Sequence, residues 1–237
     1  PLAIAAFGTP KAANLLLRRL LVETDGMIRF KVLRALGRLR ADHPTLPLDE
    51  AVLTRAFQQT LSVAFDYMRW RHALDEGARA RPARRNEVHA ALVALLRDKQ
   101  LHSVERLFRL LNLITHDEDF ARIHHGLQSV RRETRAGSRE LVEHLVVQRF
   151  REPLLELIDD LYEQSSLPAP QRLDRYEAAL AELAAGPVES VNAFATAQIA
   201  ALGIHTLSDH ISERPEFSLL HAEVVRRARR KLVGSKS

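Results

Sequence analysis

The sequence predicts an all-α protein, and three observations support this. Strong helix formers, above all Leu, Ala, Arg and Glu, dominate a chain of 237 residues that is 46% hydrophobic and 5% aromatic. Only nine Gly and ten Pro interrupt it, and β-branched residues are too scattered for a sheet protein. Apolar residues recur at helical spacing between short turn signals along the whole length.

The clearest pair of helices lies at residues 9–41. Thr9 and Pro10 form a helix start signal, an N-cap followed by proline in the first turn. The stretch "ETDG" at 23–26 is a tight turn, in which Asp25 can cap the next helix. Residues 9–41 are therefore predicted to form one helical hairpin.

Further helices are expected along the rest of the chain. Their approximate ranges are 50–77, 86–97, 100–114, 117–126, 130–147, 152–163, 171–184, 187–201, 203–212 and 215–232. Asp49 and Asp117 are expected caps, and Pro187 and Pro215 are expected in first turns. The uncharged run 190–208 contains polar side chains and is expected to be a buried helix, not a membrane span.

The hairpin carries a motif. Asp25 in the turn is followed by Ile28-Arg29, then by Ala35-Leu36-Gly37 and Leu39. This order resembles the HEAT-repeat pattern, which has Asp in the turn, then Val-Arg, then Ala-Leu-Gly-x-Leu on the second helix. Pro10 also matches that family's Pro near the start of the first helix.

A weaker copy of the motif follows at Thr134-Arg135 and Leu141-Val142, with the same spacing to within a residue. The resemblance implies a right-handed α-solenoid of HEAT-like helical hairpins over 1–237, treated as a single domain with a sub-boundary near 164–170. Hairpins stack because one alone cannot bury its apolar face. Asp25, Arg29 and Arg135 would then be structural ladder residues, each Arg reaching the turn of the adjacent unit. Ligand contact is the alternative role for these arginines.

A second resemblance covers "LLLRRLLVETDGMIRFKVLRALGRLRADHP", residues 15–44. It is similar to the helical segment of bacterial transporter-like proteins of the ADP/ATP-translocase type, which join a membrane domain to HEAT-like repeats. The resemblance implies a cytoplasmic accessory region tethered to the inner face of a membrane. Its partners would be anionic lipid or the membrane domain of the same chain. The start at Pro1, not Met, leads us to expect a fragment of a longer chain.

Basic residues supply the candidate binding site. The formal net charge is +5, and nearly all cations are Arg. Lys31, Arg34 and Arg38 are spaced i, i+3 and i+7, so they share one helix face opposite the apolar positions. They form either a basic groove for phosphate, acidic lipid or an acidic peptide, or only a solvated face. We expect an acidic protein segment as partner.

A denser basic run ends the last predicted helix. It consists of Arg226, Arg227, Arg229, Arg230 and Lys231. Cations at this end complement the helix dipole, and they could also contact anionic lipid or nucleic acid. No aromatic residue follows Phe217 to stack on bases, so sequence-specific recognition of nucleic acid is not expected.

Several kinds of chemistry are not expected. The absence of Cys excludes a disulfide, a zinc–thiolate site and a thiol nucleophile. The His and Asp residues at 116–125 lack the H-E-x-x-H spacing, and His205 with Asp209 lacks a third ligand. No nucleophile elbow, P-loop or dinucleotide fingerprint occurs. We therefore expect a non-catalytic scaffold or regulatory module without metal or cofactor; a HEAT-like DNA glycosylase is a weaker alternative.

Overall fold

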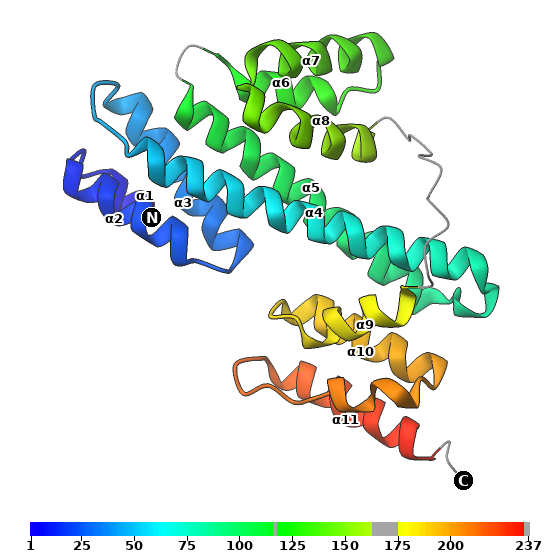
Figure 1. Ribbon diagram of the computed structural model, residues 1–237. Helices are drawn as coiled ribbons and strands as arrows, with labels where there is room; N and C mark the ends of the chain where they lie inside the picture. Colours follow the sequence, from blue (N-terminus) through cyan, green and yellow to red (C-terminus); the bar gives the residue numbers. More distant parts are fainter. Residues whose placement is uncertain (116–117, 163–174, 235–237) are drawn as a thin grey trace. The chain divides into compact units, whose positions relative to one another are not determined.

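The computed structural model describes residues 1–115, 118–162 and 175–234, and within these ranges every regular element is a helix (Figure 1). The all-α prediction is therefore confirmed. In chain order the elements are α1 (Leu2–Ala5), α2 (Pro10–Val22), α3 (Gly26–Asp42), α4 (Glu50–Ala80), the 3-10 helix η1 (Pro82–Arg84), α5 (Glu87–Ile114), α6 (Phe120–Leu127), α7 (Arg132–Leu145), α8 (Gln148–Tyr162), α9 (Tyr176–Ala185), α10 (Glu189–Leu202), the 3-10 helix η2 (His205–His210) and α11 (Leu219–Gly234).

The chain divides into two compact units. Unit 1 comprises Pro1–Asp66 and Lys99–Ser166, and unit 2 comprises Tyr67–Asp98 and Leu167–Ser237. Two of the three divisions fall inside a long helix, so α4 and α5 each contribute one part to each unit. The sub-boundary expected near 164–170 lies outside the described residues.

Unit 1 contains the predicted hairpin, formed by α2 and α3. The Thr9 hydroxyl accepts from the Ala12 amide at 3.3 Å, and the Asp25 carboxylate accepts from the Ile28 amide at 2.8 Å, so both predicted caps are present. The apolar face of each helix is buried. Elsewhere in the unit, Phe57 of α4 lies 4.3 Å from Phe150 of α8 between ring centroids. The core of the unit thus also includes contacts between helices that are far apart in the chain.

Unit 2 packs α9, α10 and α11 side by side (Figure 1). Its core also takes buried residues from the parts of α4 and α5 that belong to the unit, such as Leu74 and Leu92. The uncharged run 190–208 lies within α10 and the first part of η2. Its polar residues Asn192 and Gln198 on α10 are buried. None of the described helices combines the length and the apolar character that crossing a bilayer requires.

Several helix boundaries differ from the expected ones. The two helices expected at 86–97 and 100–114 are one helix, α5, because no Gly or Pro interrupts its buried stripe from Leu92 to Leu113. Asp117 lies outside the described residues, and α6 is capped by Asp119, which accepts from the Arg122 amide at 3.0 Å. The prolines expected in first turns precede their helices, since α10 begins at Glu189 and α11 at Leu219.

Arginine side chains occupy the carbonyl ends of several helices. Three of them, Arg29, Arg135 and Arg151, are each the fourth residue of their helix and are named here the capping arginines. Each donates back to carbonyls of the preceding turn. Arg135 Nη1 lies 3.0 Å from the Ser129 oxygen, and Arg151 Nε lies 3.1 Å from the Val146 oxygen. Because the last carbonyls of a helix have no partner within it, these bonds satisfy groups that packing would otherwise leave unpaired.

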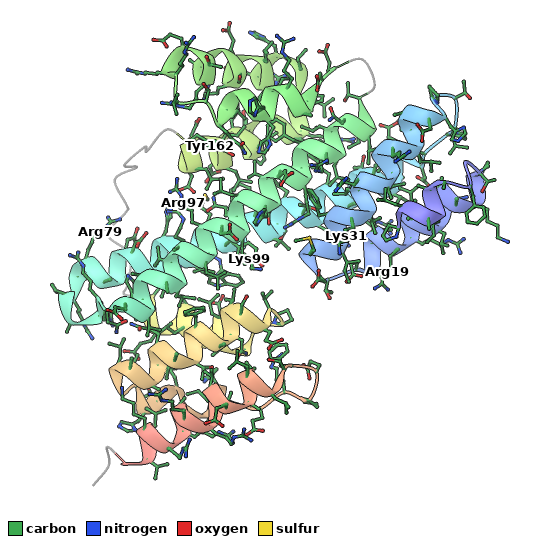
Figure 2. All side chains as sticks on the ribbon, turned by 180° about the vertical axis from the view of Figure 1, so that it is seen from behind. Arg19, Lys31, Arg79, Arg97, Lys99 and Tyr162 are labelled. Carbon is green, nitrogen blue, oxygen red and sulfur yellow. The ribbon has the colours of Figure 1, made fainter. Side chains whose placement is uncertain are left out.

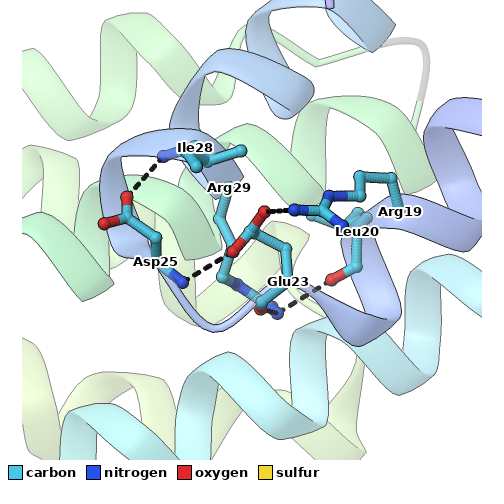
Figure 3. A network of polar contacts seen from close by, with 6 residues as sticks. All are labelled: Arg19, Leu20, Glu23, Asp25, Ile28 and Arg29. Atoms are coloured by element: carbon cyan, nitrogen blue, oxygen red, sulfur yellow. Dashed lines mark hydrogen bonds and ion pairs between the residues drawn. The ribbon is translucent and has the colours of Figure 1, made fainter. Parts of the chain in front are cut away.

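Arg29 makes the most extensive of these contacts (Figure 3). Its Nη1 donates to the oxygens of Leu20 at 2.8 Å and Glu23 at 3.0 Å, and its Nη2 donates to the Thr60 hydroxyl at 3.0 Å. It therefore binds the turn of its own hairpin and a side chain of α4, where the sequence led us to expect the turn of an adjacent hairpin. Burial lowers the pKa of its guanidinium, which nevertheless stays charged.

The same use of arginine recurs outside these three helices. Arg84 and Arg85 donate to carbonyls in the last turn of α4, at 3.1 and 3.2 Å. Arg229 donates to the Ile211 oxygen that follows η2, at 2.7 and 3.1 Å, and Arg214 donates to the Ala185 oxygen that ends α9. A cation at a helix C-terminus also complements the helix dipole, which adds to the hydrogen bond.

Replacement of Arg29 by Ala is expected to destabilise the protein by about 2–4 kcal/mol, because two carbonyls and a hydroxyl lose a charged donor. Arg29→Lys should recover only part of the loss, since one ammonium cannot span all three acceptors. Urea unfolding followed by far-UV circular dichroism measures both values. Arg34→Ala on the exposed face of the same helix is the control and should stay within about 0.5 kcal/mol of wild type. Equal losses in the two alanine variants would contradict the capping role.

Candidate anion-binding site

A hollow of about 310 Å³ opens on unit 1 between α3 and α5, and we name it the basic hollow. It is lined by Leu33, Arg34, Gly37, Arg38 and Arg40 of α3, and by Arg109, Asn112 and Leu113 of α5. The lining residues that the structure describes include no carboxylate. Its arginines, Arg34, Arg38, Arg40 and Arg109, are called the hollow arginines below.

Helix α3 places its part of the lining by helical periodicity. Arg34 and Arg38 are four residues apart and exposed, while Ala35 and Leu36 between them are buried. Gly37 lies on the same side as the arginines, and a Cβ built there would meet no atom within 4 Å. The hollow therefore stays open above Gly37 because this residue has no side chain to fill it.

Helix α5 supplies the opposite wall. The guanidinium of Arg109 lies 4.4 Å from the centroid of the Phe30 ring, a cation–π contact that holds it against α3. The Asn112 Oδ1 accepts from the Phe120 amide at 2.8 Å, so the amide Nδ2 carries the donors that remain. Arg109 and Asn112 are thus both oriented by contacts outside the hollow.

Among the three arginines that α3 contributes to the lining, Arg40 is half-buried. Its Nη2 lies 3.5 Å from the Leu113 oxygen in the last turn of α5. Burial lowers the pKa of its guanidinium from the ordinary value, and the group stays charged. A partly desolvated cation of this kind gains more from an incoming anion than a fully hydrated one does.

Carboxylates at the rim partly balance the charge. Arg38 pairs with Asp42 at 3.4 Å, and Arg109 pairs with Glu105 at 2.9 Å, both as i, i+4 pairs on one helix. Arg34 has no hydrogen bond or ion pair with any residue that the structure describes. Arg34 therefore leaves one positive charge in the basic hollow that no described carboxylate balances.

The structure places only two of the three predicted binding residues, Lys31, Arg34 and Arg38, in the basic hollow. Arg34 and Arg38 line the basic hollow, whereas Lys31 is exposed on α3 and is not a lining residue (Figure 2). The sequence analysis missed Arg40, Arg109 and Asn112. Only the spacing of Arg106 and Arg109, three residues apart, could have suggested a cationic face on α5.

The basic run of α11 serves largely internal purposes. Arg226 and Arg230 both pair with Glu223, at 3.0 and 3.3 Å, and Arg229 holds the end of η2. Arg227 and Lys231 are exposed. Of the five cations predicted to contact an anionic surface, these two form no hydrogen bond or ion pair with a described residue, and they lie four positions apart on the helix.

A second hollow, of about 430 Å³, lies between α4 and α8 in unit 1. Its apolar lining includes Leu61, Phe65 and Pro153, and its charged lining residues are Glu152 and Glu156. Among the described lining residues there is no cation, so this hollow is acidic and would repel the ligands that the basic hollow attracts.

Unit 2 contains a buried polar cluster around Tyr176. The Tyr176 hydroxyl lies 3.3 Å from His89 Nδ1 and accepts from Gln198 Nε2 at 2.9 Å, while Arg84 covers the ring at 4.4 Å. All these side chains are buried, so solvent and substrate do not reach them. The cluster joins α5, α9 and α10 and is best explained as internal support.

Trp70 in α4 is half-buried against the unit 2 core, and its indole donates to Glu182 at 2.7 Å.

Within the ranges that the structure describes, no group of three His, Asp or Glu side chains is placed to hold a metal ion. His116 and Asp117, which the sequence analysis considered for a metal site, lie outside those ranges. The basic hollow remains the strongest candidate for a binding site.

Comparisons with known protein families, with curated proteins and with solved structures found no match for this chain. The geometry of the basic hollow and the resemblances in the sequence therefore carry the functional argument.

Three histidines, of which His89 and His221 are buried and His124 is half-buried, make the stability depend on pH. Desolvation lowers the pKa of His89, of His124 beside the Phe108 ring, and of His221, whose Nε2 lies 2.7 Å from Asn192 Oδ1. As the pH falls below about 6.5, these histidines bind protons more readily in the unfolded chain than in the folded one. The free energy of unfolding should therefore decrease as the pH is lowered from about 7 to 5.5. Urea titrations across this range measure the slope.

The control for this slope is His144, which is exposed on α7. His124→Gln should flatten the pH dependence, and His144→Gln should leave it unchanged. Stability that rises on acidification in the wild type would contradict the assignment.

Proposed function

We propose that this chain is a non-catalytic helical scaffold that binds an acidic segment of a partner protein at the basic hollow. In this proposal its helices are HEAT-like hairpins stacked as a right-handed α-solenoid. The single observation that supports the binding site is the convergence of the hollow arginines from α3 and α5 on one recess. The equal placement of Arg29 and Arg135, each fourth in its helix and each bound to the preceding turn, supports a repeated hairpin.

Arginine suits this task better than lysine. The planar guanidinium donates two parallel hydrogen bonds to one carboxylate, and it is more weakly hydrated than an ammonium group. The net charge of +5 adds a long-range attraction for acidic segments. An acidic chain crossing α3 would meet Arg34 and Arg38 first, because both are exposed.

A second candidate rests on Arg227 and Lys231. Both are exposed, and neither forms an ion pair with a residue that the structure describes. In this alternative the chain is a cytoplasmic accessory domain of a nucleotide-transporter-like membrane protein, and these cations contact anionic lipid or the transporter.

The test is binding of a fluorescein-labelled peptide of alternating Glu and Gly, measured by fluorescence anisotropy at low and high salt. The double variant Arg34→Glu/Arg38→Glu should weaken binding about tenfold or more, because two charged hydrogen-bond donors become repulsive carboxylates. The matched control Arg227→Glu/Lys231→Glu makes the same change in net charge on α11 and should lose far less.

Equal weakening by the two double variants would mean that only net charge matters, and the proposed site would be wrong. Co-sedimentation with phosphatidylserine vesicles tests the second candidate. Loss of vesicle binding in the α11 variant alone, together with no binding of the acidic peptide to wild type, would favour the accessory domain.

A further inference from the structure

We propose that the group that enters the basic hollow is a phosphate monoester, carried on a phosphorylated Ser or Thr of the partner segment. This inference rests on the proposed function, because it specifies the chemistry of the segment that the same site binds. It follows from the number of donors in the hollow, from the carboxylates already at its rim and from its recessed shape.

The positive charge on the lining exceeds what one carboxylate neutralises. A carboxylate carries a single charge, which one guanidinium in a bidentate pair balances. A phosphate monoester carries a charge of about −1.5 to −2 at neutral pH and three terminal oxygens that accept hydrogen bonds in several directions. Arg34 and Arg38 of α3 and Arg109 of α5 approach from two helices, and Asn112 adds amide donors, which matches the phosphate.

The carboxylates at the rim also favour a phosphate over a carboxylate as the ligand. Asp42 and Glu105 already pair with Arg38 and Arg109, so an incoming Asp or Glu side chain would exchange one carboxylate for another with little gain. Both resident pairs are exposed or half-exposed i, i+4 pairs, which are weak. A dianion draws both arginines inward more strongly than the single charges it displaces.

The shape favours a side chain over a flat surface. Arg40 is half-buried, and the side chain of Arg109 is 36% exposed, whereas that of Arg38 is 72% exposed. The less exposed arginines are therefore less accessible to a flat membrane surface than to a single side chain that enters beside Gly37. Gly37 leaves this entrance open, since no atom lies within 4 Å of the position that its Cβ would take.

The experiment uses the full chain and three labelled peptides of one sequence, with Ser, phosphoserine or Glu at the central position. Anisotropy should show that the phosphoserine peptide binds about tenfold or more tightly than the Glu peptide, because additional charged hydrogen bonds form. Inorganic phosphate should compete with it. Arg34→Gln/Arg38→Gln should abolish the difference between the two peptides, and Arg227→Gln/Lys231→Gln, with the same loss of charge, should preserve it.

A glycine pair separates shape from charge. Gly37→Leu keeps all hollow arginines but fills the entrance, so it should weaken phosphoserine binding. Gly137→Leu is the matched control, because Gly137 is exposed on α7 and also has no atom within 4 Å of its Cβ position. Circular dichroism melts establish that each variant is folded.

The outcomes separate this inference from the proposed function. Equal binding of the Glu and phosphoserine peptides, lost in Arg34→Gln/Arg38→Gln, overturns the phosphate inference and leaves the acidic-segment function standing. Failure of both peptides to bind overturns both proposals. Tighter retention on vesicles that contain phosphatidic acid than on the phosphoserine peptide also overturns the inference, because the phosphate would then come from lipid.

Discussion

The hydrogen bond from an arginine guanidinium to the carbonyl end of a helix is the interaction on which this structure depends most. A chain made of short helices has many ends, and the last carbonyls of each need partners when the ends are packed. Here Arg29 and Arg84 bond carbonyls in the last turn of a helix, and Arg135, Arg151 and Arg229 bond carbonyls of the residues that follow one. The guanidinium suits the task because it has several donors in one plane and a charge that opposes the helix dipole.

This role divides the basic residues into two groups with different consequences. Helix α3 shows both, because Arg29 turns back to the hairpin turn while Arg34 and Arg38 face the basic hollow. The capping arginines are half-buried and bonded to the backbone, so they are unavailable to a ligand. At the basic hollow, Arg38 and Arg109 form only exposed or half-exposed pairs with rim carboxylates, and Arg34 forms no ion pair with a described residue. Some of the arginines therefore stabilise the scaffold, and others line the proposed anion site.

The sequence predicted the local features well and the tertiary ones poorly. Helical periodicity located most helices, the Thr9-Pro10 start signal located the cap at Thr9, and the turn motif located the cap at Asp25. Arg151 was missed because its helix was expected to begin at 152, whereas α8 begins at Gln148. Arg109 and Asn112 were missed because their meeting with α3 depends on how α3 packs against α5, which no local pattern encodes. The partners of the α11 run were not predicted either, since Arg226 and Arg230 pair with Glu223 and Arg229 bonds the Ile211 carbonyl.

The most direct test compares two triple variants that remove the same charge. One replaces the capping arginines Arg29, Arg135 and Arg151 by Gln, and the other replaces the exposed Arg34, Arg38 and Arg227 by Gln. The measurement is the free energy of unfolding in urea, followed by far-UV circular dichroism. If capping holds the helix ends, the first variant should lose most of its stability, and the second should stay close to wild type. Equal stability of the two variants would contradict the account.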